Sequence, residues 1–102
     1  MAREVRYLVE ALEEAEAAAA WYAARSPSAA SSFDAELAAA EQAISQHPLA
    51  WPPFESDTHR YLLRRFPFSV VYYLEAHRAV IVAVAHAHRR PGYWRSRLQR
   101  PG

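Results

Sequence analysis

The chain has 102 residues, of which 52% are hydrophobic, so its length predicts one domain with one core. It contains no cysteine, which excludes a disulfide scaffold, a thiolate zinc site and a cysteine nucleophile. Glutamates interrupt the apolar N-terminal stretch, which therefore resembles neither a signal peptide nor a membrane span. These features predict a soluble cytoplasmic protein, with residues 1–102 as a single domain whose last few residues form a flexible tail.

Charge is distributed unevenly along the chain, although the net charge is only +1. Residues 1–57 carry ten acidic residues and three arginines, whereas residues 58–102 carry nine arginines and one glutamate. A basic half favours a polyanionic or acidic partner, because opposite charges steer association. Alternatively, the arginines solvate one face and pair with the acidic helices.

The first half of the chain predicts a strand followed by two helices. Residues 3–9 alternate as in a short strand, and residues 11–24 are mostly the helix formers alanine and glutamate. Ser26 and Pro27 predict the start of a second helix, which ends near His47 because Pro48 follows. The predicted apolar stripe of the first helix is Leu8, Leu12, Ala15, Ala19 and Tyr22. That of the second is Phe33, Leu37, Ala40 and Ile44.

The second half predicts a loop and three strands. Three prolines place residues 47–58 in a loop without regular structure. Strands are expected at residues 60–65, 69–74 and 79–85, and the last is apolar throughout, so both of its faces require cover. The order β-α-α-β-β-β predicts an α+β domain, with a helical hairpin packed on one face of a small, mostly antiparallel sheet. The first strand is expected beside the last.

Three clusters of side chains carry the candidate chemistry. Arg60, Arg64 and Arg65 form the first, and on a strand Arg60 and Arg64 would share a face able to bind phosphates or carboxylates. Alternatively, this is an exposed face that happens to be basic. The second cluster is His86, His88, Arg89 and Arg90. Histidine acts as an acid or base near neutral pH, but a structural role for His86 is equally compatible with the sequence.

The third cluster is Tyr93, Trp94, Arg95 and Arg97. Aromatic rings interleaved with arginines can stack on bases and bind phosphate, or Tyr93 and Trp94 can close the sheet against the core. We expect no metal, because the paired histidines lack a third ligand and the adjacent arginines repel a cation. We expect no cofactor, because two glycines do not make a phosphate-binding loop.

Two sequence blocks resemble the RelE/ParE toxin superfamily, and the resemblance covers roughly residues 3–97. Residues 60–72, RYLLRRFPFSVVY, are similar to its R-x-x-x-x-x-F-P-Y-x-I-x-Y block. The run 80–84, followed by His86, Arg89, Tyr93, Trp94 and Arg97, resembles the closing V-x-H-x-x-R-x-P-x-Y-W-x-x-R block of one branch. The resemblance implies a toxin of a type II toxin–antitoxin system, which inhibits growth, can stabilise plasmids and is neutralised by a cognate antitoxin.

The superfamily divides between RelE-like members, which cut messenger RNA on the ribosome, and ParE-like members, which poison DNA gyrase. The RelE-type site needs basic residues where this sequence has Leu62, Ser69 and Ala87. We therefore favour a ParE-like member, with a RelE-like ribonuclease and a non-toxic interaction module as alternatives. If the chain is a ribonuclease, its catalytic residues are Arg60, His86, Arg89 and Tyr93.

The sequence predicts a binding surface for the target or the antitoxin, rather than a catalytic site. Its expected residues are Arg60, Arg64, Arg65, His88, Arg89, Arg90, Trp94 and Arg97. We expect the antitoxin to cover part of this basic sheet face, in a groove lined by Phe68, Tyr72 and Tyr73.

Overall fold

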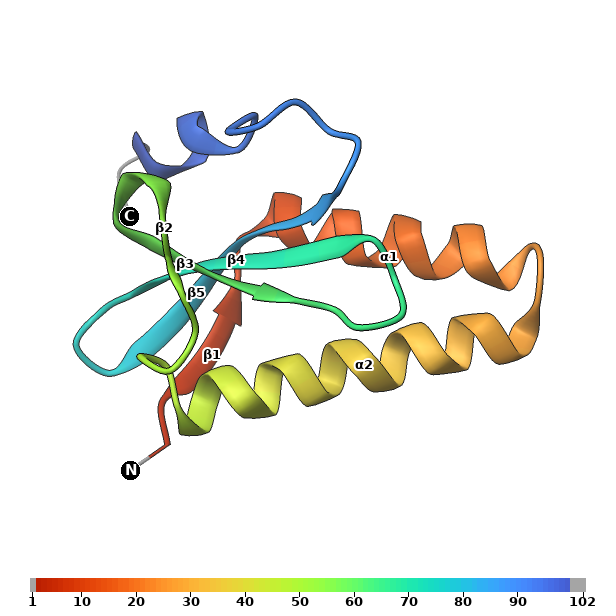
Figure 1. The fold of residues 1–102 in the computed structure, drawn as a ribbon, viewed down its shortest axis with the longest axis horizontal. Coiled ribbons are helices and arrows are strands. Elements are labelled where there is room, and N and C mark those ends of the chain that lie inside the picture. The colour runs from red at the N-terminus through yellow and green to blue at the C-terminus, as the bar shows by residue number, and fades with distance from the viewer. Residues whose placement is uncertain (1, 100–102) are drawn as a thin grey trace.

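The two predicted helices form an antiparallel hairpin along one side of the molecule (Figure 1). The computed structural model describes residues 2–99, so the expected flexible tail lies mostly outside the described residues. Helix α1 spans Val9–Ala23 and α2 spans Pro27–Gln46. Ser26 caps α2 as predicted, because its hydroxyl oxygen accepts a hydrogen bond from the Ala29 N–H at 3.3 Å. No helix within residues 2–99 has the length and apolar character needed to cross a membrane.

The buried face of α2 matches the prediction, and that of α1 matches it except at Leu12, because Ala15 is buried and Leu8, Ala19 and Tyr22 pack half-buried against the core. Phe33, Leu37, Ala40 and Ile44 are all buried. On α1 the buried residues are Ala11, Ala15 and Ala18, and the predicted Leu12 is 44% exposed. In a helix this rich in alanine several faces are apolar, so packing against α2 and the sheet selects the face that is buried. The prediction of Leu12 as a core residue was wrong for this reason.

Five strands form one sheet in the order β1-β5-β4-β3-β2. Their bounds are Glu4–Tyr7 for β1, Pro53–Phe54 for β2, Thr58–Leu62 for β3, Phe68–Leu74 for β4 and Arg78–His86 for β5. β1 runs parallel to β5, and the other pairs are antiparallel. The α+β class is confirmed, and so is the position of the first strand beside the last.

Two boundaries of the sheet differ from the prediction. The predicted loop holds the short edge strand β2 and a 3-10 turn, Glu55–Asp57, because an edge strand tolerates Pro53, which has no N–H to donate. β3 ends at Leu62 instead of residue 65. There the Glu36 carboxylate accepts the backbone N–H groups of Arg64 and Arg65, at 2.8 and 3.3 Å, and turns the chain out of the sheet.

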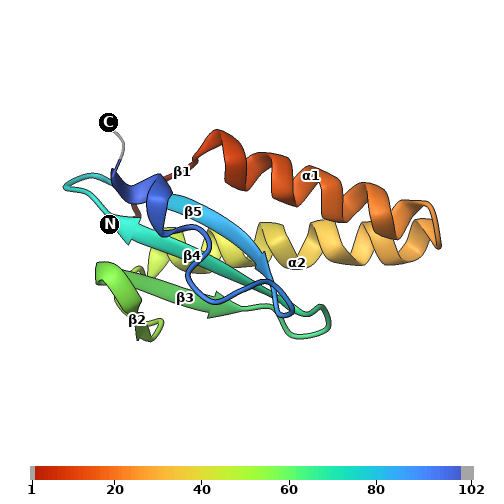
Figure 2. The ribbon, with the colours of Figure 1, turned by 90° about the horizontal axis from the view of Figure 1, so that it is seen from above.

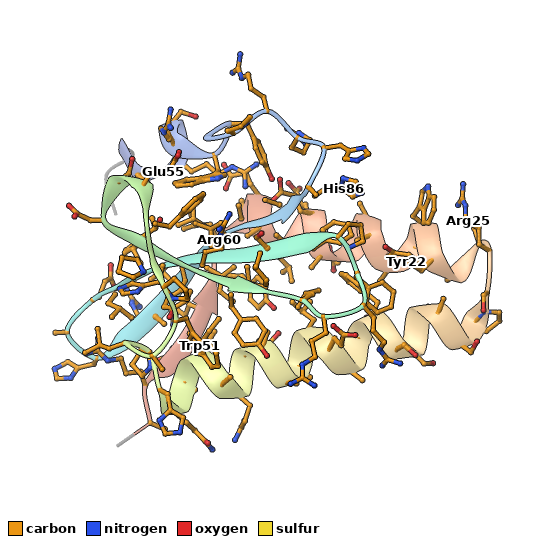
Figure 3. The ribbon with its side chains drawn as sticks, viewed as in Figure 1. Tyr22, Arg25, Trp51, Glu55, Arg60 and His86 are labelled. Atoms are coloured by element: carbon orange, nitrogen blue, oxygen red, sulfur yellow. The ribbon has the colours of Figure 1, made fainter. Side chains whose placement is uncertain are left out.

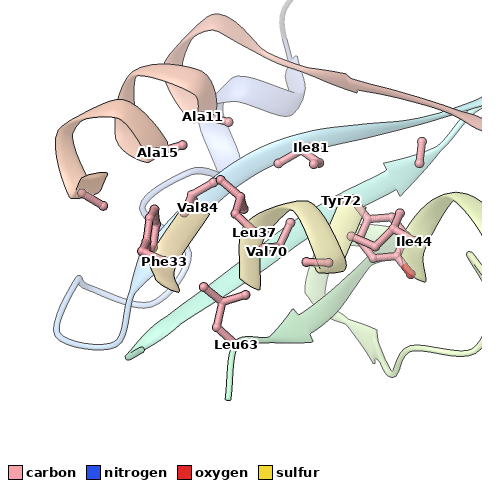
Figure 4. Packing of buried hydrophobic residues seen from close by; sticks show 13 residues of the cluster. Ala11, Ala15, Phe33, Leu37, Ile44, Leu63, Val70, Tyr72, Ile81 and Val84 are labelled. Carbon is pink, nitrogen blue, oxygen red and sulfur yellow. The ribbon is translucent and has the colours of Figure 1, made fainter. Parts of the chain in front are cut away.

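A β-bulge divides the side chains of β5 between the two faces of the sheet. Val71 pairs with Ala83 and Tyr72 pairs with Ile81, so Val82 is an extra residue on β5. Val82 and Ala83 consequently belong to one cluster, whereas Ile81 and Val84 belong to the core beneath the helices (Figure 4). Both faces of β5 are covered, as its continuous apolar sequence predicts.

The second face of the sheet is covered by the C-terminal segment, residues 87–98, which crosses β5 and β4 on the side opposite the helices (Figure 2). Trp94 is only 2% exposed and its ring lies 6.0 Å from that of Phe54. Arg95 forms an ion pair with Glu55, which ties the segment to the turn before β3. Trp94 therefore closes the sheet, and as a buried side chain it offers no surface to a partner, contrary to its place in the predicted binding set.

We predict that Trp94→Ala lowers the free energy of unfolding by about 3–5 kcal/mol, because a large buried ring leaves a cavity. Urea unfolding followed by circular dichroism measures the change. Trp21→Ala is the matched control, since Trp21 is 53% exposed and its loss should cost only about 1–2 kcal/mol. Equal losses in the two variants would contradict a core role for Trp94.

Candidate functional site

The site begins where β1 stops and the outer edge of β5 has no further strand beside it within residues 2–99, although β4 still pairs with the other edge. β1 ends at Tyr7, and the Leu8 N–H still reaches the Ile81 carbonyl at 2.9 Å. Beyond this point side chains take the place of a neighbouring strand. The Glu14 carboxylate accepts the Val84 N–H at 3.0 Å, and Arg97 donates to the Val82 carbonyl at 2.9 Å. Two backbone groups at the edge of β5 thereby obtain the partners that β1 does not provide.

Glu14 and Arg97 also bind each other, and we call the pair together with Tyr93 the Glu14 clamp. Both guanidinium nitrogens Nη1 and Nη2 of Arg97 lie 3.0 Å from the carboxylate oxygens of Glu14. The Tyr93 hydroxyl donates to Oε2 of Glu14 at 2.5 Å. The Arg97 and Glu14 side chains are 14% and 16% exposed, so the bidentate pair is largely shielded from water. The clamp fastens the C-terminal segment to α1 and β5.

The contacts within the clamp raise the pKa values of Tyr93 and Arg97. Burial raises the pKa of Tyr93, and the hydrogen bond to the Glu14 carboxylate raises it further. Burial alone would lower the pKa of Arg97, but the hydrogen bonds and the charge of Glu14 outweigh it and raise the pKa. Tyr93 consequently holds its proton, and Arg97 its charge, throughout the physiological range.

Next to the clamp lies a groove of about 540 Å³, which we call the aromatic groove. Its walls are α1, the turn before β4, the end of β5 and the start of the C-terminal segment (Figure 3). The residues that line it are Glu14, Ala17, Ala18, Trp21, Tyr22, Pro67, Phe68, Val84, His86, Arg89 and Tyr93. The bulge shifts the alternation of side chains along β5 by one residue, so His86, like Val84, lies on the face of the sheet that carries the helices. The His86 imidazole meets the Phe68 ring edge-on, with 5.0 Å between the ring centres.

Arg25 and Arg89 stand at the rim of the aromatic groove, each stacked on a ring that lines it, and Arg90 follows Arg89 in the chain. The Arg25 guanidinium lies 3.5 Å from the centre of the Trp21 ring, and that of Arg89 lies 3.9 Å from the centre of the Tyr93 ring. Arg90 is exposed. Among residues 2–99, none of these three arginines forms an ion pair, whereas Arg6, Arg65, Arg78, Arg95 and Arg97 all do. The rim thus keeps cationic groups that no carboxylate neutralises.

The first predicted cluster is not a single surface. Arg60 lies on the sheet face opposite the helices, with its guanidinium 4.5 Å from the Phe54 ring centre. Arg64 and Arg65 lie in the turn after β3, and Arg65 forms an ion pair with Glu36 at 2.9 Å. Because β3 ends at Leu62, the prediction that Arg60 and Arg64 share a strand face was wrong.

The other two clusters contribute three residues to the aromatic groove, namely His86, Arg89 and Tyr93. His88 stands beside His86, whose Nδ1 accepts the His88 backbone N–H at 3.0 Å. Arg97 belongs to the clamp rather than to an exposed binding surface. Of the four ribonuclease candidates, the structure therefore brings three together and leaves Arg60 on the opposite face of the sheet.

The predicted groove formed by Phe68, Tyr72 and Tyr73 does not exist. Successive residues of a strand point to opposite faces, and Phe68 and Tyr72 pack beneath the helices while Tyr73 packs under the C-terminal segment. Tyr72 is fully buried and donates its hydroxyl to the Pro48 carbonyl at 2.6 Å, and burial raises its pKa to about 12. Phe68 alone of the three lines the aromatic groove.

Glu14 is the site residue that the sequence did not single out. It is one of several glutamates on an alanine-rich helix, and nothing in its spacing distinguishes it from its neighbours. Its partners Val84, Tyr93 and Arg97 lie 70 to 83 residues away in the chain. Within residues 2–99, no three histidine, aspartate or glutamate side chains gather in a way that would hold a metal ion.

Comparison with known proteins places this architecture in a class of small toxins. The family model described as the ParE toxin of the type II toxin–antitoxin system parDE matches residues 5–91. A solved chain titled "Chromosomal ParDE TA system from P. aeruginosa" shares the fold, with a TM-score of 0.73 and 15% sequence identity. The match covers 84% of this chain and 97% of that one. No curated protein matches the chain. The chain belongs to the ParE toxin family, as the resemblance of its sequence predicted.

We predict that Glu14→Gln lowers the free energy of unfolding by at least ~2 kcal/mol, because it leaves the shielded charge of Arg97 without a partner. Glu4→Gln removes an ion pair whose partners are 61% and 59% exposed, and it should change stability far less. Urea unfolding of both variants makes the comparison. Losses of similar size would show that the clamp contributes no more than an exposed pair.

We predict that loss of the Tyr93 hydroxyl proton at alkaline pH lowers the free energy of unfolding. Since the pKa of Tyr93 is higher in the folded chain than its ordinary value of about 10, the unfolded chain releases this proton first. The stabilisation is complete below pH 10 and is lost as the pH rises toward the folded pKa. Urea unfolding between about pH 10 and 12 should show a shallower decline for Tyr93→Phe than for the unchanged chain. Parallel curves would contradict this, because Tyr7 and Tyr72 contribute equally to both.

Proposed function

We propose that the chain is a growth-inhibiting toxin that acts by binding DNA gyrase and that a cognate antitoxin neutralises it in the cytoplasm. Membership of the ParE toxin family supports a toxin of a type II system. The observation that carries the choice of target is the Glu14 clamp. It engages the Tyr93 hydroxyl, which the ribonuclease branch of the superfamily needs for chemistry.

RNA cleavage without a metal needs groups that take and give protons at the reacting phosphate. Tyr93 is unsuited to this because its hydroxyl donates to Glu14 and its pKa is raised. Arg60 lies on the opposite sheet face from His86, so the two do not act on one phosphate. Together with Leu62, Ser69 and Ala87, which are not basic, these contacts favour a recognition surface over a ribonuclease site.

Basic residues that follow β5, residues in the turn after β3 and Arg60 on β3 together supply the proposed recognition surface, which extends over more than one face of the sheet. From the predicted set we retain Arg64, Arg65, His88, Arg89 and Arg90, all of which are exposed, and Arg60, which is partly exposed. Trp94 and Arg97 leave the set because they are held in the core and in the clamp. We propose that gyrase and the antitoxin both contact this surface, so that the antitoxin neutralises the toxin by covering it.

The RelE-like alternative keeps one supporting observation, since His86, Arg89 and Tyr93 line the same groove. If the chain cuts messenger RNA, primer extension on translated messages after induction will show new 5′ ends. If it is an interaction module without toxicity, its expression without a partner will not slow growth.

A supercoiling assay with purified gyrase and relaxed plasmid tests the proposed target. We expect the chain to inhibit supercoiling in a dose-dependent way, and the product of the adjacent open reading frame to restore it. Arg89→Gln combined with Arg90→Gln should weaken inhibition, because these cations have no ion-pair partner among residues 2–99. The control is Arg6→Gln with Arg78→Gln, which changes the net charge equally but affects residues on β1 and at the start of β5. Normal supercoiling at a large excess of the chain would refute gyrase as the target.

A further inference from the structure

We propose that the aromatic groove binds single-stranded nucleic acid, with one unpaired base inside the groove and the flanking phosphates on Arg25, Arg89 and Arg90. This inference does not rest on gyrase as the target, and it concerns a ligand that the chain would bind alone. It is carried by the combination of aromatic rings and unpaired cations in one half-open groove.

The lining of the groove suits the flat face of a base. Trp21, Tyr22, Phe68, His86 and Tyr93 contribute five rings, and most of the remaining lining is alanine, valine or proline. Trp21 remains 53% exposed although Arg25 covers part of its ring. Stacking on such rings is tolerant of sequence, because every base has a π-face. A volume of about 540 Å³ accommodates a single base with its sugar, whereas a paired base keeps its faces covered within the duplex.

The cations at the rim are held in position for phosphate. The Arg25 guanidinium is fixed by stacking on Trp21 and by a 3.0 Å hydrogen bond to the Trp21 carbonyl. The Arg89 guanidinium is fixed on the ring of Tyr93, and both residues line the groove. A guanidinium stacked on a ring keeps most of its N–H groups for a phosphate oxygen. Phosphates on either side of an inserted base would meet these two arginines.

Within residues 2–99, Glu14 is the one carboxylate that lines the groove, and the clamp neutralises it. Its oxygens already accept bonds from Arg97, Tyr93 and the Val84 N–H, so it presents little free negative charge to a phosphate. An acidic peptide would use the same arginines. The five rings favour a nucleic-acid strand over a peptide, because acidic side chains gain nothing from stacking.

Fluorescence anisotropy with a labelled oligothymidylate of twelve nucleotides tests the inference on the purified chain alone. We expect binding that weakens with salt, with a slope of about +2 in log Kd against log salt for three phosphate contacts. Oligouridylate should bind equally well, because stacking on the rings and contacts to phosphate do not depend on the 2′-hydroxyl. A duplex of the same length should bind about tenfold more weakly or worse, because its bases stay stacked.

Paired variants separate stacking and charge from general effects. Trp21→Ala should weaken binding about tenfold, whereas Trp21→Phe keeps a ring and should stay within about threefold. Arg89→Gln with Arg90→Gln should weaken binding about tenfold and reduce the salt slope, and Arg6→Gln with Arg78→Gln should leave both unchanged. All these side chains are at least partly exposed, so the variants should fold, which circular dichroism checks.

Several outcomes overturn the inference. They are absence of binding, equal affinity for the duplex, an unchanged affinity in Trp21→Ala, and equal losses in the two double-arginine variants. Displacement of the oligonucleotide by an equimolar oligoglutamate peptide would assign the groove to an acidic protein partner instead. None of these results bears on the supercoiling assay, so this inference and the proposed target fail independently.

Discussion

The largely shielded ion pair between Glu14 and Arg97 is the interaction on which the rest of this structure depends. β1 is too short to accompany β5 along its length, and an edge strand with unpaired backbone groups in a low-dielectric environment is costly. Glu14 accepts the N–H of Val84 and Arg97 donates to the carbonyl of Val82. The same two side chains bind each other, so closing the strand edge also fixes the C-terminal segment over the sheet.

That segment supplies the second layer of the core and one wall of the aromatic groove. Trp94 covers Val71, Val82 and Ala83, which would otherwise face water, and Tyr93 is held against Glu14. Arg89 rests on the Tyr93 ring in turn. The bonds that order these groups also restrict their chemistry, since an engaged tyrosine of raised pKa does not shuttle protons.

The uneven charge of the chain has two consequences in the fold, and each matches one of the alternatives that the sequence left open. Glutamates of the acidic half neutralise arginines of the basic half in the pairs Glu14–Arg97, Glu36–Arg65 and Glu55–Arg95. The arginines at the rim of the groove have no such partner within residues 2–99. Part of the basic half is therefore structural, and the remainder is free for a polyanionic partner.

The sequence by itself determined the two helices, the three long strands of the second half, the two-sided cover of β5 and the resemblance to the superfamily. These features depend on residues close together in the chain: the periodicity of apolar residues, the Ser26 cap and the prolines that end helices and strands. Only the tertiary structure decided which alanines of α1 are buried, where β3 ends and that Trp94 and Arg97 are held inside. It also revealed Glu14, whose partners lie up to 83 residues away. Local patterns cannot encode a contact whose two halves meet only when the sheet and the hairpin have packed.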